Sequence, residues 1–143
     1  MASKLGNITF YADDPPLLAQ FWAGVFRYPP VEWDEPLKSQ LLGSGLTESD
    51  LDKRGVAEPA EGEEGPRFFF HHARAAKTER NRVHLDIQST PGHPPTRQEL
   101  EDEKDRLVAL GAVVVRLVDQ RWGPWPELYY QLRDPEGNEF CLQ

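Results

Sequence analysis

The amino-acid sequence predicts an α+β fold built from two modules, each with a strand, a helix and then about three further strands. Three observations support this prediction. Segments with strand-like alternation precede amphipathic helical segments, this order occurs twice in 143 residues, and an offset of 77 places residues 7–10 over residues 84–87. We therefore expect one domain, residues 1–143, with a first module at about 5–72 and a second at about 82–143.

The first module begins with residues 5–11, which alternate apolar and polar side chains at the strand period. Asp14, Pro15 and Pro16 follow as a capping and start signal for a helix. That helix carries an apolar stripe formed by Leu17, Leu18, Phe21, Trp22, Val25 and Phe26. After it we expect short strands at residues 30–33 and 40–42, an acidic loop at residues 47–64, and a strand at residues 67–72.

The second module repeats this order. Residues 82–88 alternate like a strand, and Thr96 to Glu99 form a capping box that starts a helix ending before Gly111. The apolar residues of this helix are Leu100, Leu107, Val108 and Leu110. We expect strands at residues 112–118, 128–133 and 139–143, a loop containing Trp122 and Trp125, and a turn at Asp134–Asn138.

The alternation divides each strand into an apolar and a polar set. The apolar sets, which should lie under the helices, are Ile8 and Phe10, then Val83, Leu85 and Ile87, then Phe140 and Leu142. The opposite face would carry Asn7, Thr9, Tyr11, His84, Asp86, Glu139 and Cys141. This face is either simply solvated or a concave surface that holds a small ligand, with a rim formed by Phe70, Trp122, Trp125 and Tyr130.

Composition limits the function classes. With 16 Lys and Arg against 24 Asp and Glu, the net charge is −8, which argues against binding to nucleic acid. The apolar stretch at residues 107–118 is shorter than the roughly 18 residues that a membrane span needs, and no signal peptide follows Met1. The single cysteine, Cys141, excludes an internal disulfide. We expect a cytoplasmic protein with no nucleic-acid or membrane partner.

Several motifs together indicate a family. They are Asn7-Ile8-Thr9-Phe10, Phe21-Trp22, Val83-His84-Leu85-Asp86, Leu110-Gly111-Ala112 and Asp134-Pro135-Glu136-Gly137-Asn138-Glu139-Phe140. With them, the chain resembles the vicinal oxygen chelate superfamily of glyoxalases, bleomycin-resistance proteins and extradiol dioxygenases, and within it the glyoxalase-like branch. The resemblance covers the chain outside residues 47–64. It implies two βαβββ modules that form a cup-shaped, partly open mixed β-sheet barrel with helices outside, and often a homodimer.

The resemblance also implies where a divalent metal would lie. Position by position, the superfamily's metal ligands fall on Asn7, on a residue near Phe70 to His72, on His84 and on Cys141. Only His84 is a usual ligand type, and Cys141 stands where the family usually has Glu. We therefore favour no metal cofactor; if a divalent metal is bound, His84 and Cys141 should hold it, with His71 or His72 as a third ligand.

The leading hypothesis is a glyoxalase-like protein that binds a small organic molecule in the cup without a metal. The residues expected to bind it are Asn7, Thr9, Phe70, His84, Asp86, Trp122, Tyr130 and Glu139. The alternatives are a metal-dependent lyase, isomerase or dioxygenase with an unusual ligand set, and a bleomycin-type resistance protein whose negative charge suits a cationic drug. A nucleophilic pair of Cys141 and His84 is a further alternative. The sequence leaves open whether the protein is an enzyme, which ligand it binds, and whether the acidic loop is a lid or simply solvated.

Overall fold

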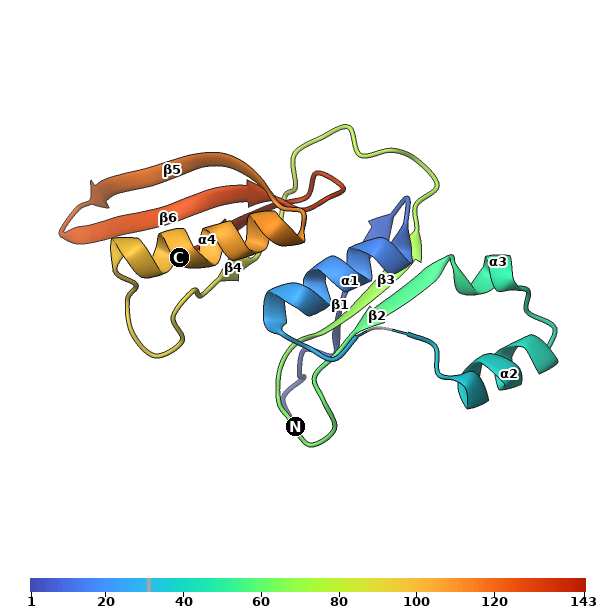
Figure 1. Cartoon of the computed structure of the whole chain (residues 1–143). Coiled ribbons are helices and arrows are strands. Elements are labelled where there is room, and N and C mark those ends of the chain that lie inside the picture. Colours follow the sequence, from blue (N-terminus) through green and yellow to red (C-terminus); the bar gives the residue numbers. More distant parts are fainter. Residues whose placement is uncertain (31) are drawn as a thin grey trace. The chain divides into compact units, whose positions relative to one another are not determined.

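The computed structural model describes residues 1–30 and 32–143 (Figure 1). The chain divides into two compact units, Met1–Ala76 and Lys77–Gln143, each with its own sheet. The predicted module limits lie inside these two units. The predicted α+β class is confirmed, because each unit combines at least one helix with a small sheet that contains both parallel and antiparallel pairs.

The sheet of the first unit has the strand order β1-β3-β2. β1 (Asn7–Ala12) runs parallel to β3 (Arg67–His72), and β2 (Arg54–Ala57) pairs antiparallel with the other edge of β3. The predicted alternation in β1 is confirmed, since Asn7, Thr9 and Tyr11 are exposed while Ile8 and Phe10 are half-buried. These alternating positions give the sheet one polar face and one face that packs against a helix.

The helix α1 (Pro15–Phe26) covers the apolar face of this sheet. It starts as predicted, because the Asp14 carboxylate accepts a hydrogen bond from the backbone N–H of Leu17 at 3.1 Å. Its Trp22 ring stacks on Phe10 at 5.4 Å and on Phe68 at 5.7 Å. Leu17 departs from the predicted stripe, since it is 53% exposed and lies at the margin of the buried face.

Between α1 and β3 the structure corrects the sequence prediction. Residues 40–42 belong to a helix, α2 (Glu35–Gly43), because Asp34 caps its first turn by accepting a hydrogen bond from Leu37 N–H. The predicted acidic loop contains a short helix, α3 (Glu48–Leu51), and the strand β2. The strand expected at residues 30–33 is not seen at residues 30, 32 and 33, which are irregular, and Val31 lies outside the described residues.

The sheet of the second unit has four strands in the order β4-β7-β6-β5. β4 (Asp86–Ile87) runs parallel to β7 (Glu139–Leu142), which pairs antiparallel with β6 (Trp125–Arg133). β6 in turn pairs antiparallel with β5 (Val113–Trp122). Both sheets thus join their first strand in parallel to their last strand. The predicted repeat of three strands after the helix holds only for the second unit, since the described part of the first unit has two.

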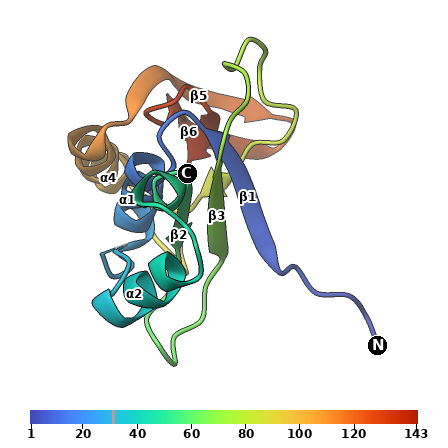
Figure 2. The same ribbon diagram turned by 90° about the vertical axis from the view of Figure 1, so that its right-hand side faces the viewer.

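The helix α4 (Arg97–Leu110) lies against one face of the second sheet (Figures 1 and 2). The predicted capping box is confirmed, with Thr96 and Glu99 bonded reciprocally. Leu100 and Leu107 are fully buried, whereas Val108 and Leu110, which were also expected in the core, are exposed. The core of this unit also contains Ile87, Leu132, Phe140 and Leu142.

Two further expectations for the second unit need correction. The strand expected at residues 82–88 is reduced to β4, and Val83 is 79% exposed because it precedes the paired segment. Trp122 and Trp125 do not lie in a loop. They pair opposite each other at the end of the β5–β6 hairpin, where the turn contains Gly123 with a φ of 59°. No helix in the described residues is both long and apolar enough to cross a membrane.

Candidate functional site on the second sheet

The turn before β7 is built around one buried carboxylate. Asp134 is 1% exposed, and its Oδ1 accepts hydrogen bonds from the backbone N–H of Glu136 at 2.9 Å and of Asn138 at 3.0 Å. Its Oδ2 accepts a third bond from the Asn138 side chain at 2.8 Å. Gly137 provides the positive φ, 85°, that the turn requires. The D-P-E-G-N motif therefore sets where β7 begins and which of its side chains face away from α4.

A row of polar side chains crosses the second sheet on the face opposite to α4. Asp86 of β4 is paired with Cys141 of β7, Cys141 with Gln131 of β6, and Gln131 with Arg116 of β5. Residues paired directly across a sheet point to the same face, so each strand contributes one of these four side chains. Arg116 Nε donates a hydrogen bond to Gln131 Oε1 at 2.7 Å. We call these four residues the polar row.

His84 extends the polar row at its acidic end. His84 Nδ1 lies 3.2 Å from Asp86 Oδ1, and one ligand atom each of His84, Asp86 and Cys141 lies within 4.8 Å of the others. The backbone N–H of Cys141 donates to the Leu85 carbonyl at 2.9 Å, which ties β7 to the segment that carries His84. The side chains of His84 and Asp86 are about half exposed, whereas Cys141 is 9% exposed.

The environment of Cys141 keeps its thiol protonated. Burial raises the pKa of the thiol, and the negative charge of Asp86 and a hydrogen bond to that carboxylate raise it further. Arg116 acts in the opposite direction without reversing the shift. Because the thiolate is the nucleophilic form of cysteine, this arrangement does not favour a Cys141–His84 nucleophilic pair.

The same three residues suit a divalent metal ion of the zinc type. Imidazole nitrogen, carboxylate oxygen and thiolate sulfur are all zinc ligands, and three protein ligands leave a position for a substrate or water. His84 and Cys141 are the two residues that the sequence marked as ligands if a metal is bound. Asp86 was assigned only to ligand binding. Its spacing of two from His84, which in an extended segment puts both side chains on one side, is the sequence signal that the two could act together.

Glu139 lies on the same strand as Cys141, and its carboxylate contacts Asn81 and Lys77. Its Oε2 accepts a hydrogen bond from the Asn81 backbone N–H at 2.9 Å and lies 3.3 Å from Lys77 Nζ. Partial burial raises the pKa of this carboxyl, but the bonds from Asn81, from its own backbone and from Lys77 outweigh burial and lower the pKa. Glu139 thus anchors residues 77–81 to the start of β7.

Two aromatic residues expected at a ligand-binding rim lie elsewhere. Phe70 is fully buried and stacks on Phe10 at 5.5 Å in the core of the first unit. Tyr130 is buried on the α4 side of the second sheet, where its hydroxyl donates to Glu101 at 2.5 Å. Trp122 and Trp125 are exposed and stack at 5.4 Å, at the far end of the hairpin from the polar row.

The first sheet has different side chains at the positions that correspond to Asp86 and Cys141 of the second sheet. Asn7 and Thr9 are exposed on the polar face of β1, and Thr9 pairs with Phe69, as Asp86 pairs with Cys141 in the second sheet. A phenyl ring therefore occupies the place of the thiol. His71 lies beside the Tyr11 ring at 6.2 Å, and His72 is exposed. That Asn7 or Thr9 joins the second-sheet residues in one site stays a prediction.

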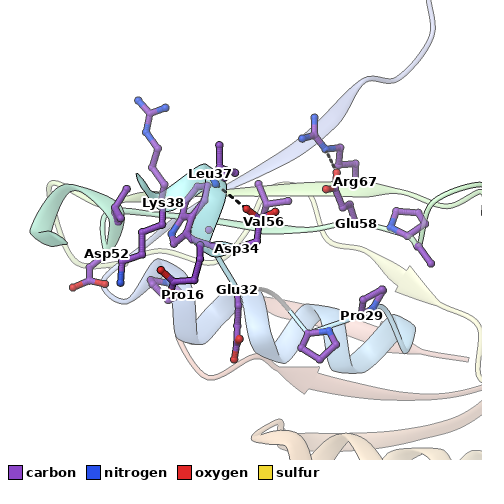
Figure 3. Close-up of a pocket in the computed structure, with 18 of the residues that line it drawn as sticks. Pro16, Pro29, Glu32, Asp34, Leu37, Lys38, Asp52, Val56, Glu58 and Arg67 are labelled. Carbon is purple, nitrogen blue, oxygen red and sulfur yellow. Dashed lines mark hydrogen bonds and ion pairs between the residues drawn. The ribbon is translucent and has the colours of Figure 1, made fainter. Parts of the chain in front are cut away.

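Two cavities lie away from the polar row, and the sequence indicated neither of them. The larger is a groove of about 730 Å³ on the first unit, between α2, β2 and the segment that precedes α2 (Figure 3). The smaller, of about 430 Å³, lies on the second unit beside Gln88, His93 and Gln143.

Comparison with known proteins identifies the fold as that of the vicinal oxygen chelate superfamily. A fosfomycin resistance protein, FosX, from Listeria monocytogenes, in complex with Mn(II) and 1S,2S-dihydroxypropylphosphonic acid, has a TM-score of 0.64 at 19% identity, covering 100% of this chain and 92% of that chain. A glyoxalase-related enzyme from Fulvimarina pelagi has a TM-score of 0.61 at 17% identity, with 99% and 87% covered. A glyoxalase/bleomycin resistance protein/dioxygenase family enzyme from Burkholderia phytofirmans PsJN has a TM-score of 0.60 at 14% identity, with 95% and 94% covered.

The chain belongs to the glyoxalase-like domain family, whose model matches residues 7–143. The resemblance stated from the sequence motifs is thereby confirmed. No protein of curated function matches the chain.

Proposed function

We propose that the protein binds a small organic molecule along the polar row of the second sheet, beside His84. The observation that carries this proposal is the continuous series of polar side chains, one from each of the four strands, on the face opposite to α4. The row has a guanidinium at one end and a carboxylate at the other. A ligand that lies across it would meet a different kind of group at each end.

The chemistry of the row indicates the kind of ligand. Arg116 uses Nε for Gln131 and has four further N–H donors, which suit a carboxylate, phosphonate or carbonyl oxygen. Asp86 is a hydrogen-bond acceptor at the other end and suits a hydroxyl or amine of the ligand. The small hydroxylated phosphonate held by the Listeria FosX structure has groups of both kinds, which supports a ligand of this general type.

The test is an NMR binding screen on chelator-treated, isotope-labelled protein with a library of small hydroxylated carboxylates and phosphonates. We expect shifts at Asp86, Gln131 and Cys141, and affinity about tenfold weaker in both Arg116→Gln and Asp86→Asn, since each loses a charge-assisted hydrogen bond. Arg121→Gln is the matched control on the same strand but the opposite face. A ligand bound equally well by Arg116→Gln and Asp86→Asn would contradict this placement.

A second candidate function, metal binding, rests on the grouping of His84, Asp86 and Cys141 within 4.8 Å. These three residues would hold a zinc-type ion, and the Mn(II) in the FosX complex supports a metal in this superfamily. When bound, such an ion would act as a Lewis acid on an oxygen of the substrate. This candidate corresponds to a metal-dependent lyase, isomerase or dioxygenase. The bleomycin-type drug-binding alternative stays a prediction.

Elemental analysis of untagged protein, followed by cobalt(II) titration, tests the metal. We expect one ion per chain and a thiolate-to-cobalt absorption that Cys141→Ser abolishes and His84→Ala weakens, whereas His93→Ala, an exposed loop histidine, leaves it unchanged. Because the thiol must lose its proton, affinity should rise by about tenfold per pH unit below the thiol pKa. Absence of this absorption would remove the metal candidate and leave the small-molecule proposal standing.

A further inference from the structure

The groove on the first unit is lined by both apolar and acidic side chains. Figure 3 shows side chains from α2, from β2 and from the segment that precedes α2 around one open space of about 730 Å³. This volume is within the usual range of ligand sites, about 300–1,000 Å³. Its apolar side chains include Pro29, Trp33, Leu37, Leu51 and Val56.

One wall of the groove is an open sheet edge. Arg54, Gly55 and Val56 of β2 line it, and β2 is the last strand of its sheet, with no strand of the described residues paired to its outer edge. An unpaired edge presents backbone N–H and carbonyl groups that can bond to another strand.

In the second sheet, the edge that corresponds to the outer edge of β2 is paired with a further strand. In each sheet the first strand pairs in parallel with the last, and the last pairs antiparallel with the strand before it, so β2 corresponds to β6. The far edge of β6 is covered by the antiparallel strand β5. The groove beside β2 therefore lies where a fourth strand is present in the second sheet.

The charge of the lining defines the occupant further. Seven carboxylates and three basic side chains line the groove. Two of the bases are already ion-paired, Lys38 with Glu48 at 3.2 Å and Arg67 with Glu58 at 2.6 Å. The remaining acidic residues, which outnumber the one remaining base, Arg54, are Glu32, Asp34, Glu35, Asp52 and Glu61. An occupant with positive charge complements this lining.

We propose that this groove binds an extended basic peptide segment of a partner protein, which adds to the first sheet as a strand beside β2. The peptide main chain would pair with the β2 edge, its Lys or Arg side chains would meet the carboxylates of Glu32 and Asp52, and its apolar side chains would contact Trp33 and Val56. This mode of recognition takes affinity from main-chain bonds and specificity from alternate side chains.

The probe is a blocked hexapeptide of alternating Lys and Val, added to the full chain and followed by NMR. We expect saturable shifts at Gly55 and Val56 and slower hydrogen exchange at the outward β2 amides. The same peptide with N-methyl groups on alternate residues keeps its charge but loses backbone N–H donors for the β2 edge. It should therefore bind at least about tenfold more weakly. Equal binding of the N-methylated peptide would overturn strand addition.

Charge variants supply the second measurement. Glu32→Lys combined with Asp52→Lys should weaken peptide binding by about tenfold or more, because attraction becomes repulsion. The control, Glu79→Lys combined with Asp102→Lys, makes the same change in net charge at exposed positions outside the groove and should leave affinity unchanged. Equal loss in both pairs would reveal nonspecific attraction. If benzyltrimethylammonium displaced the peptide with an affinity equal to that of the peptide itself, the groove would be a site for small cations. Either of these two results would overturn the proposal.

Discussion

Asp86 and Cys141 face each other across the parallel pairing of β4 with β7, and a carboxylate oxygen of Asp86 lies within 4.8 Å of the Cys141 sulfur. The carboxylate is half exposed, whereas the thiol is almost fully buried. The negative charge at this distance makes ionisation of the thiol more costly. The Cys141 thiol is therefore a weaker acid than a free cysteine thiol.

The first prediction concerns the reactivity of this thiol. Asp86→Asn removes a charge that raises the pKa of Cys141, so alkylation by iodoacetamide should begin at lower pH than in the parent protein. Arg116→Gln should shift the profile to higher pH, because Arg116 lowers this pKa. Since Cys141 is the only cysteine, mass spectrometry of the intact chain measures the rate directly. Identical profiles for the two variants would show that neither charge acts on the thiol.

The second prediction concerns the turn before β7. Asp134→Ala removes the acceptor of three hydrogen bonds at a fully buried position, so it should lower the free energy of unfolding by about 2–4 kcal/mol. Glu63→Ala, in an exposed loop, should change it by less than about 0.5 kcal/mol. Urea unfolding followed by tryptophan fluorescence gives both values. A small effect of Asp134→Ala would mean that the turn forms without its buried carboxylate.

The third prediction is a pH dependence of stability. The Tyr130 hydroxyl, followed by Arg97 and Lys104, lowers the pKa of Glu101 from 4.5 to about 2. Because the folded-state pKa is the lower one, the stabilisation is present above about pH 4.5 and is lost as the pH falls towards 2. Tyr130→Phe should weaken this loss, whereas Tyr129→Phe should leave it intact. Urea midpoints measured across this pH range test it, and equal slopes in all three proteins would contradict the assignment.

The fourth prediction compares two glycines of the first unit. A Cβ on Gly55 would lie 2.7 Å from the Pro15 carbonyl oxygen and 2.9 Å from Ala19 Cβ, so Gly55→Ala should destabilise the protein by about 1–3 kcal/mol. A Cβ on Gly43 would meet nothing within 4 Å, and Gly43→Ala should stabilise it by up to about 1 kcal/mol. Thermal unfolding distinguishes the two signs. A neutral Gly55→Ala would show that α1 can move away from β2.

The parts of the fold that the sequence predicts well are those with a strong local signal. Asp14 before two prolines, and the Thr96–Glu99 capping box, each define a helix start through side chains close in sequence. β2 has no such signal, because a run of four residues is too short to show a clear strand alternation and these residues are held by pairing with β3. The sequence does not predict helix α2, because its apolar residues are few and none of them is buried.

The candidate site, like the fold, can be predicted from the sequence only where the signal is local. Alternation within a strand places His84 and Asp86 on one face, and the D-P-E-G-N motif marks where the strand with Cys141 starts. The contributions of Gln131 and Arg116 depend on the register of β6 against its two neighbours, which spacing along the chain does not determine. For this reason the sequence prediction places Tyr130 beside the ligand, whereas in the structure its neighbour Gln131 is the residue paired with Cys141.

The segment between β3 and β4 bears on how the chain can be cut and reassembled. It carries Arg74, Arg80 and Arg82, all exposed, close in sequence to the boundary between the two units. Limited trypsin digestion should therefore act here early and release two fragments of similar length, each retaining a complete sheet and its main helix. The same segment is the natural place to divide the gene for a split-protein reporter.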